Sequence, residues 1–458
     1  MIKPSLPQGT RDFAPQIVRR RQYILKTIAS VFEVHGFQPL ETPAMENLDT
    51  LLGKYGDEGD KLIFRILNNG LDNPAKRSQS LEAFEQVLNG QGSKSLTERA
   101  LRYDLTIPFA RYVAMNHGQL SFPFKRYQMQ PVWRADRPQK GRYREFWQCD
   151  ADVVGSASLL NEAELIQIYR EAFRRLGISV DVRINNRKIL AALAESCNAS
   201  EKLTDITVAI DKLDKIGIDK VMEELEQRGL DAGNRERVRA YLLIDGSTDE
   251  RLDRIEQLLG HTGSGRQGVQ ELRWLAGFLR TSEGSYPFSI DFTLARGLNY
   301  YTGTILEVKA IGVSMGSIGG GGRYDDLTGL FGVPGIPGVG ISFGVDRIYD
   351  VMEETGAFPA SLGVSTRALF FNLGEEETRY AWTAMLELRA AGIPCELYPE
   401  AVKFDRQFKY AEKKGIPAVV IAGSEEMSKG VFRVKILSSG TQTECGAEEL
   451  ETILSQAS

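Results

Sequence analysis

Apolar side chains recur at helical spacing over residues 15–34, and Gly36 follows as a stop signal. This pattern predicts an amphipathic helix, followed by a short extended piece, FQPLETP, that Pro43 ends. From Leu71 to Leu96 the chain is polar and weakly patterned, which predicts a surface insertion with a short helix. The next segment, LRYDLTIPFARYVAMN, predicts a strand that runs into a helix.

Residues 125–155 alternate in the way that a β-hairpin requires. KRYQMQPVWR and EFWQCDADVV predict two antiparallel strands, and ADRPQKGRYR predicts a long basic loop between them. Successive strand residues point to opposite faces, and one face of the second strand is expected in the core: Trp147, Cys149, Ala151 and Val153. The other face carries an aromatic side chain and then polar ones, Phe146, Gln148, Asp150 and Asp152. That order of side chains suits the floor of a cleft.

The character of the patterns changes three times along the rest of the chain. Between residues 186 and 287 they are helical and charged, which predicts an inserted helical domain. Strand patterns resume at FSIDFTLARGLNYYTGTILEV and at GVGISFGVDRIYDVMEE, where a glycine-bearing strand feeds a helix. After Gly363 strands and helices alternate, as in a small α/β domain. We therefore expect four parts: 1–185, 186–287, 288–362 and 363–458.

Composition narrows the class of protein. A chain of 458 residues with 42% hydrophobic and 26% charged residues is expected to form several globular domains. We expect no membrane span and no signal peptide, and hence a cytoplasmic location, because no apolar run is long enough. The net charge of −5 does not indicate a dedicated nucleic-acid binder, so local basic patches must carry any such function.

Cysteine and histidine are too sparse for several kinds of site. The four cysteines are isolated and show neither CxxC nor disulfide-framework spacing. The three histidines are far apart, which leaves little for a histidine-based metal site or a Ser/His/Asp triad. We assign no metal ligand among the protein side chains. Catalysis is expected to depend on arginines, carboxylates and backbone amides.

Four segments carry candidate chemistry, each with a plainer alternative. The basic loop 134–145 is either solvated or grips phosphate, with Arg134 near the cleft face and Phe146 able to stack on a base. GSIGGGGRYDD is either a tight turn, close packing beneath a ligand, or a ligand-lining segment. Arg347, early in its helix, is either an exposed arginine or a cation kept for an anion or a purine face. Asp104 and Thr106, expected on one strand face, are either a solvated pair or part of a pocket for an ammonium group, with Asp152 opposite.

Together these segments resemble class II aminoacyl-tRNA synthetases and, within that class, the histidyl-tRNA synthetase family. The helix and strand ending at Pro43 are similar to motif 1, residues 125–154 to motif 2, and residues 338–349 to motif 3. LPQGTRDF and ARGLNYY are similar to peptides that distinguish the histidyl enzymes. The resemblance spans nearly the whole chain. It implies an α+β catalytic core built on an antiparallel sheet, a helical insertion, and a C-terminal α/β anticodon-binding domain.

The resemblance also implies an activity. A member of this family activates L-histidine with ATP, with Mg²⁺ expected, to histidyl-adenylate and pyrophosphate, and then transfers histidine to the 3′ end of tRNA(His). It further implies a two-fold homodimer. We expect no editing activity, because a site that hydrogen-bonds a polar ring already rejects apolar analogues. The helical insertion is expected to grip tRNA, and the domain after Gly363 to meet the anticodon.

Individual roles follow from the resemblance, position by position. The histidine-binding residues would be Asp104, Thr106, Gln148, Asp152, Tyr300 and Tyr301. The catalytic residues would be Arg134 and Arg296, which meet the α-phosphate. The ATP-binding residues would be Arg134, Arg142 at the distal phosphates, and Phe146 and Arg347 on either side of adenine. The tRNA-binding residues would be Arg137, Gln139 and Lys140. LRYDLT has aspartate where many bacterial members carry LRPEGT, so the pocket is closer to the archaeal and eukaryotic variety.

Three other readings compete with this one. The regulatory subunit of ATP phosphoribosyltransferase resembles the same catalytic core but lacks the C-terminal domain and differs in the substrate peptides. A synthetase for another amino acid would share motifs 2 and 3 without ARGLNYY. A pure RNA-binding protein would not need the arginines that face the nucleotide.

Overall fold

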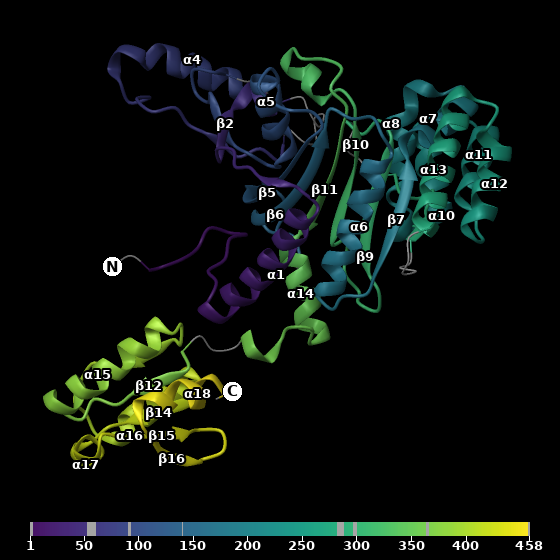
Figure 1. Ribbon diagram of the computed structural model, residues 1–458. Coiled ribbons are helices and arrows are strands. Elements are labelled where there is room, and N and C mark those ends of the chain that lie inside the picture. Colours follow the sequence, from purple (N-terminus) through teal and green to yellow (C-terminus); the bar gives the residue numbers. More distant parts are fainter. Residues whose placement is uncertain are drawn as a thin grey trace. The chain divides into compact units, whose positions relative to one another are not determined.

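The computed structural model of the chain describes residues 3–52, 61–89, 93–139, 141–281, 288–295, 300–362 and 366–456. Its contacts divide the chain into two compact units (Figure 1). Unit 1 comprises residues 1–12 and 21–357, and unit 2 comprises residues 13–20 and 358–458. Helix α1, Pro15–Val34, contributes to both units and confirms the helix that the apolar spacing predicts. The four-part division at residues 185, 287 and 362 stays a prediction.

Unit 1 is built on an eight-stranded sheet in which antiparallel pairs dominate. The pairs β1–β5 and β7–β8 are parallel, and every pair between them is antiparallel. In sheet order the strands are β1 Gln38–Pro39, β5 Phe124–Trp133, β6 Glu145–Val154, β11 Gly338–Gly344, β10 Gly319–Tyr324, β9 Thr304–Ala310, β7 Val180–Asn186 and β8 Phe288–Ile290. The predicted hairpin is confirmed as β5 and β6.

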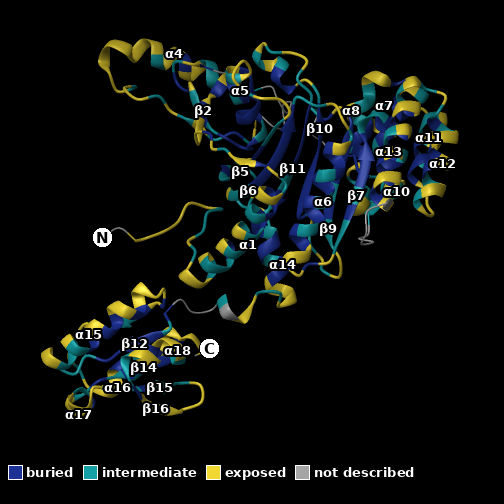
Figure 2. Ribbon diagram, in the orientation of Figure 1, coloured by how far each residue is buried: buried dark blue, intermediate teal, exposed yellow. Residues whose placement is uncertain are grey.

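Helices pack on one face of this sheet, where the buried residues gather (Figure 2). They are α6, Leu160–Arg175, and α14, Val345–Thr355, joined by Phe32 of α1. The ring centroid of Tyr169 lies 4.7 Å from that of Phe343, and that of Phe32 lies 5.8 Å from it. Aromatic side chains therefore form the centre of this core.

The predicted core face of β6 is confirmed at three positions, because Cys149, Ala151 and Val153 are fully buried. At Trp147 the prediction is wrong. This residue is half-buried and lines a cavity, since it lies near the loop end of the strand. There its backbone N–H donates to Asp346 Oδ2 at 3.3 Å.

The segment between β7 and β8 is helical in its described part, as its charged patterns predict. The helices pack on one another beside β7 (Figure 1). They are α7 Arg187–Ser196, α8 Leu203–Ile210, α9 Leu213–Ile216, α10 Ile218–Gln227, α11 Ala232–Leu242, α12 Thr248–Leu259 and α13 Gly263–Thr281. Throughout the described residues, every helix falls short of the length and apolarity that a membrane span needs.

A second, three-stranded sheet in unit 1 has the order β2-β4-β3. Its elements and neighbours are β2 Met45–Asn47, α2 Leu48–Leu51, β3 Arg65–Ile66, α4 Arg77–Leu88, β4 Arg99–Leu101 and α5 Thr106–Asn116. Helix α4 confirms the short helix predicted in the polar insertion. The shared strand face expected for Asp104 and Thr106 is wrong. Asp104 Oδ1 instead accepts from the Ile107 backbone N–H at 3.3 Å, which satisfies an unpaired donor at the start of α5, and Thr106 is that helix's first residue.

Two further expectations change near the glycine-rich segment. The alternating run FSIDFTL forms a strand for three residues, because Asp291 Oδ1 accepts from the Thr293 N–H at 3.0 Å and turns the chain. The tight turn considered for GSIGGGGRYDD is wrong. Residues 319–324 are the buried strand β10, paired with β9 on one side and β11 on the other.

Unit 2 alternates strand and helix after residue 366, as predicted. Its sheet has the order β13-β12-β14-β15-β16. The elements are β12 Ala368–Phe370, α15 Glu375–Ala390, β13 Cys395–Leu397, α16 Phe404–Lys414, β14 Ala418–Ile421, α17 Ser424–Lys429, β15 Phe432–Ile436, β16 Gln442–Cys445 and α18 Ala447–Gln456. Two clusters of buried apolar side chains stabilise it, one containing Phe370 and Val420, the other Phe371 and Val419. Successive strand residues point to opposite faces, so both faces of the sheet are covered. The sequence patterns missed α17 and β16.

Candidate functional site

The strands of unit 1 create a cavity of about 580 Å³. Strand register explains its shape. Asp150 of β6 pairs with Gln128 of β5 and Ser342 of β11, and Ser342 pairs with Gly320 of β10. Two residues further along, a second row pairs Arg126 of β5 with Asp152 of β6. This row continues to Gly340 of β11 and Gly322 of β10. Polar side chains on two strands therefore face glycine and serine on the next two, which leaves a hollow with a polar floor.

A buried ion pair anchors this floor. Arg126 Nη2 lies 2.8 Å from Asp152 Oδ2, and the two side chains are 0% and 3% exposed. The Tyr324 hydroxyl donates to Asp152 Oδ1. Burial raises the pKa of Asp152, while Arg126 and Tyr324 act to lower it. The carboxylate is thus held in place by two partners that favour its charged form.

Two other carboxyl groups lie close to this pair. Burial raises the pKa of Asp104 to about 7, with Arg134 acting in the opposite direction. Burial raises the pKa of Asp150 to about 7 as well, although Arg126 lowers it. Both groups therefore change charge near neutral pH and gain from a cation in the cavity.

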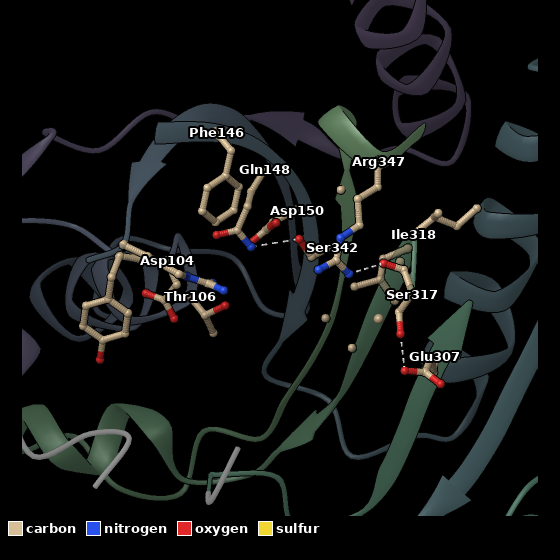
Figure 3. A pocket seen from close by; sticks show the side chains of 18 of the residues that line it. Asp104, Thr106, Phe146, Gln148, Asp150, Glu307, Ser317, Ile318, Ser342 and Arg347 are labelled. Carbon is tan, nitrogen blue, oxygen red and sulfur yellow. Dashed lines mark hydrogen bonds between the residues drawn. The ribbon is translucent and has the colours of Figure 1, made fainter. Parts of the chain in front are cut away.

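The floor holds acceptor atoms without protein donors. Gln148 Nε2 donates to Ser342 Oγ at 3.0 Å, as the dashed line in Figure 3 marks. Within the described part of the chain, the buried atoms Gln148 Oε1 and Asp150 Oδ1 have no hydrogen-bond partner. Such groups are costly unless a bound molecule satisfies them. The floor therefore suits a ligand that is rich in N–H donors.

Asp104, in the loop before α5, and Thr106, the first residue of that helix, both reach the cavity (Figure 3). The loop is fixed from behind by the buried guanidinium of Arg102, which donates to the Pro131 carbonyl at 3.0 Å through Nε. Arg134 Nε donates to the Tyr103 carbonyl at 2.9 Å and fixes it from the other side. These bonds bring two residues of LRYDLT to the strand β6 that carries Gln148 and Asp152.

Tyr300 and Tyr301 both line the cavity. Their ring centroids lie 4.7 Å apart, and the ring of Tyr300 lies 6.2 Å from that of Tyr324, edge to face. Burial raises the pKa of Tyr300 well above its usual value, so its hydroxyl stays protonated near neutral pH. Arg296, predicted as a catalytic residue, lies outside the described residues.

The rim is lined by groups suited to a nucleotide. Arg134 Cζ lies 5.1 Å from the centroid of the Phe146 ring. Phe146 and Arg347 stand on opposite sides of the cavity in Figure 3. Arg347 donates to the Gly141 carbonyl at 3.0 Å and to the Ser317 carbonyl at 2.7 Å. Its guanidinium plane is therefore held in one orientation.

The loop between β5 and β6 carries the remaining predicted residues. Arg142 lines the cavity and lies 3.7 Å from Asp136 in an ion pair. Arg137 and Gln139 are exposed and are not among the residues that line the cavity. Lys140 lies outside the described residues.

Several residues at the site received no role from the sequence, among them Arg126, Asp150, Glu307 and Tyr324. Asp150 was placed on the cleft face by alternation, so its signal was present. Arg126 carried no such signal, because it is the third residue of a polar strand, FKRYQMQPVW, and follows Lys125. Glu307 accepts a hydrogen bond from the Ser317 hydroxyl. Nothing in the sequence indicated a role for it beyond its place in an alternating strand.

The described residues contain no group of three or more His, Cys, Asp or Glu side chains that could hold a metal ion. Mg²⁺ that accompanies a nucleotide usually takes one or two carboxylates and keeps phosphate and water ligands. Glu307 and Asp136 are carboxylates in the lining of this cavity and fit that requirement.

Comparison with known proteins identifies relatives over the whole chain. A family model described as "Histidyl-tRNA synthetase" matches residues 76–348, and one described as "Anticodon binding domain" matches residues 368–457. A histidine–tRNA ligase of Bacteroides fragilis is 50% identical over 451 residues, 98% of each chain. One of Cytophaga hutchinsonii is 49% identical over 456 residues, 98% of this chain and 99% of the relative.

The chain is also similar to solved structures. The crystal structure of histidyl-tRNA synthetase from a Nostoc species has a TM-score of 0.82 and 33% identity, and covers 100% of both chains. A Bacillus halodurans structure titled as an ATP phosphoribosyltransferase regulatory subunit or histidyl-tRNA synthetase has a TM-score of 0.73. It is 20% identical and covers 92% of this chain and 99% of its own, so it shows a shared fold.

Proposed function

The chain belongs to the histidyl-tRNA synthetase family and has the activity of a histidine–tRNA ligase, and we propose that the cavity of unit 1 is where it activates histidine. As such a ligase it uses histidine, ATP and tRNA(His). One observation carries the assignment of the site. The described residues that the family assigns to histidine and to ATP, contributed by four separate segments, line a single cavity.

The floor is assigned to histidine. Asp104, Thr106 and Gln148 receive the α-ammonium group, and Asp152, Tyr300 and Tyr301 receive the imidazole ring. The buried partners of Asp152 support this, because Arg126 and Tyr324 leave it an oriented acceptor for a ring N–H. An apolar analogue of histidine would leave these groups unpaired, which explains selection without editing.

The rim is assigned to ATP. Phe146 and Arg347 hold adenine between them, and Arg142 meets the distal phosphates. Arg134 binds the α-phosphate, at which the histidine carboxylate oxygen attacks while the bond to pyrophosphate breaks. Charge grows on phosphate oxygens in this step, so a fixed guanidinium accelerates it without any protein nucleophile. Arg296 is proposed for the same task by family resemblance.

Mg²⁺ is proposed to enter with ATP. Glu307 and Asp136 are the carboxylates that would hold it, and its chemistry there is to neutralise charge on the phosphates. In the second half-reaction the terminal tRNA hydroxyl attacks the histidyl carbonyl and AMP leaves. Arg137, Gln139 and Lys140 are proposed to meet the acceptor end, and residues 363–458 the anticodon.

A two-fold homodimer and a cytoplasmic location are also proposed. Resemblance of α1 and the following strand to motif 1 supports the dimer. Light scattering tests it, since a dimer has twice the chain mass of 51.0 kDa, and the mass of one chain would overturn it. The division into four parts, 1–185, 186–287, 288–362 and 363–458, stays part of this proposal, and limited proteolysis that cuts mainly at these boundaries would support it.

The activity is tested by ATP–pyrophosphate exchange with each of the 20 amino acids, on the wild type and on Arg134→Ala. We expect exchange with histidine only, and its loss in the variant. A folded wild type without exchange would favour the regulatory-subunit reading. The 50% identity to a ligase over 98% of the chain and the matched anticodon-binding domain argue against that reading.

A further inference from the structure

We propose that residues 8–11, which we call the N-terminal brace, position the two walls of the ATP side of the cavity, and that Arg11 is its main positioning residue. The inference rests on the proposed function of that cavity. The brace belongs to unit 1, and Arg11 is not among the residues that line the cavity. Its contacts reach both the start of α14 and the loop between β5 and β6.

The first contact is with α14. The Arg11 guanidinium donates to Asp346 Oδ1, which also receives Arg21 Nη1 at 2.6 Å. Asp346 is 6% exposed and precedes Arg347, the proposed adenine contact. A carboxylate in the first turn of a helix is favoured by the helix dipole. Two arginines on this carboxylate therefore fix where α14 begins and where Arg347 stands.

The second contact is with the loop. Arg11 Cζ lies 3.2 Å from the centroid of the Tyr143 ring, beside Arg142, the proposed contact of the distal phosphates. The Arg144 N–H donates to the Gly9 carbonyl at 2.9 Å, and Arg144 Nη1 reaches the Gln8 carbonyl at 3.4 Å. One backbone bond and one side-chain bond thus attach the brace to the end of the loop.

Gly9 is required for this close approach. Its φ of +87° lies in the region that favours glycine. A Cβ atom there would lie 2.8 Å from Arg144 Cγ and 2.9 Å from Pro138 Cγ. Both the backbone conformation and the packing therefore exclude a larger residue, which is independent evidence that the segment is fitted to the loop.

The two braced walls meet at Arg347. Its Nε donates to the Gly141 carbonyl of the loop at 3.0 Å. A shift of either wall changes the space between Phe146 and Arg347, whereas the floor of the cavity lies on β5 and β6. Loss of the brace is therefore expected to affect ATP more than histidine.

Exchange kinetics test this on the full-length protein. We expect Arg11→Ala to raise the KM for ATP about tenfold, with the KM for histidine unchanged, because small misplacements of binding groups are costly. Arg11→Lys keeps a positive charge beside Asp346 but loses the flat contact with Tyr143. Its KM for ATP should therefore lie between those of the wild type and Arg11→Ala. Gly9→Ala should act in the same direction as Arg11→Ala. Ser428→Ala is the control with unchanged constants, since its exposed hydroxyl donates to the Glu425 carbonyl within α17 of unit 2.

Three outcomes would overturn the inference. An unchanged KM for ATP in Arg11→Ala, with an active wild type, overturns the brace and leaves the proposed function intact. An equal rise of both KM values overturns it as well, because that marks general loss of structure. A wild type without histidine-dependent exchange overturns the proposed function and the brace together. If Arg11→Ala does not fold, the ratio of the two KM values in Arg11→Lys decides.

Discussion

Three buried carboxyl groups, those of Asp104, Asp150 and Asp152, surround the buried guanidinium of Arg126 in the floor of the cavity. Arg126 pairs with Asp152, and each of the other two carboxyl groups is left with a pKa of about 7. The α-ammonium group and the ring N–H of histidine are proposed to complete the charge and hydrogen-bond balance of this floor.

Removing one partner of the Arg126–Asp152 ion pair should lower the free energy of unfolding of unit 1. Asp152→Asn leaves a buried guanidinium without its counter-charge, so we expect unit 1 to lose about 3 kcal/mol of stability. Denaturant unfolding followed by tryptophan fluorescence measures this. Asp150→Asn is the matched control, since Asp150 forms no ion pair in the described part of the chain, and it should cost much less. Equal losses in the two variants would contradict the assigned role of the pair.

The raised pKa values predict a dependence of stability on pH. In the unfolded chain these carboxyls titrate near 3.8, and in the folded protein Asp104 and Asp150 titrate near 7. The folded state thus binds more protons between these values, so their contribution is complete below the lower pKa and is lost as pH rises through about 7. We expect the Asp104→Asn, Asp150→Asn double variant to lose less stability than the wild type as pH rises. Thermal melting from about pH 5 to about pH 8 tests this, and parallel curves would contradict it.

The strands β10 and β11 give the cavity its volume through their glycines. A Cβ atom at Gly340 would lie 1.9 Å from Asp152 Oδ1, and one at Gly322 would lie 2.5 Å from the Thr304 carbonyl. The carboxylate of Asp152 therefore rests directly on the backbone of β11. This arrangement joins two strands that are far apart in the sequence.

Gly340→Ala should displace Asp152 although the residue itself makes no polar contact with substrate. We expect kcat/KM for histidine to fall by about tenfold or more in the exchange reaction. Gly118→Ala is the control, because a Cβ atom there meets nothing within 4 Å. A Gly340→Ala protein with the activity of the control would show that the floor is not packed in this way.

Patterns within one segment of the sequence predicted most helices and strands. Features that depend on pairing between distant strands could not be predicted. The helix 15–34 and the hairpin of β5 and β6 follow from spacing within one segment. The floor residues of β6 followed too, because alternation places Gln148, Asp150 and Asp152 on one face. The register of β6 with β11 could not be predicted, so the partner of Asp150 and the need for glycine at residue 340 were not visible. LRYDLT failed for a related reason, since the bond from Ile107 to Asp104 belongs to the start of a helix and leaves no periodic trace.

The whole chain combines two units, each with a core of its own. Activation of histidine is proposed for the cavity of unit 1, and recognition of the tRNA anticodon is proposed for residues 363–458. Loss of the C-terminal domain should therefore impair the charging of tRNA and leave the activation of histidine intact. This division also explains why the sequence patterns change character near residue 363.

A chain that ends at Leu362 tests that separation. We expect it to keep histidine-dependent ATP–pyrophosphate exchange, because all described lining residues of the cavity precede that point. Charging of tRNA(His) should fall by about a hundredfold or more, since anticodon contacts are lost. Charging at the full-length rate would contradict the proposed role of the C-terminal domain.

The central claim is that one cavity holds histidine on its floor and ATP at its rim. Steady-state exchange with two variants, Gln148→Ala in the floor and Arg347→Ala at the rim, tests it most directly. We predict that Gln148→Ala raises the KM for histidine about tenfold or more with the KM for ATP unchanged, and that Arg347→Ala does the reverse. Two variants that raise both constants alike, or neither of them, would contradict the account.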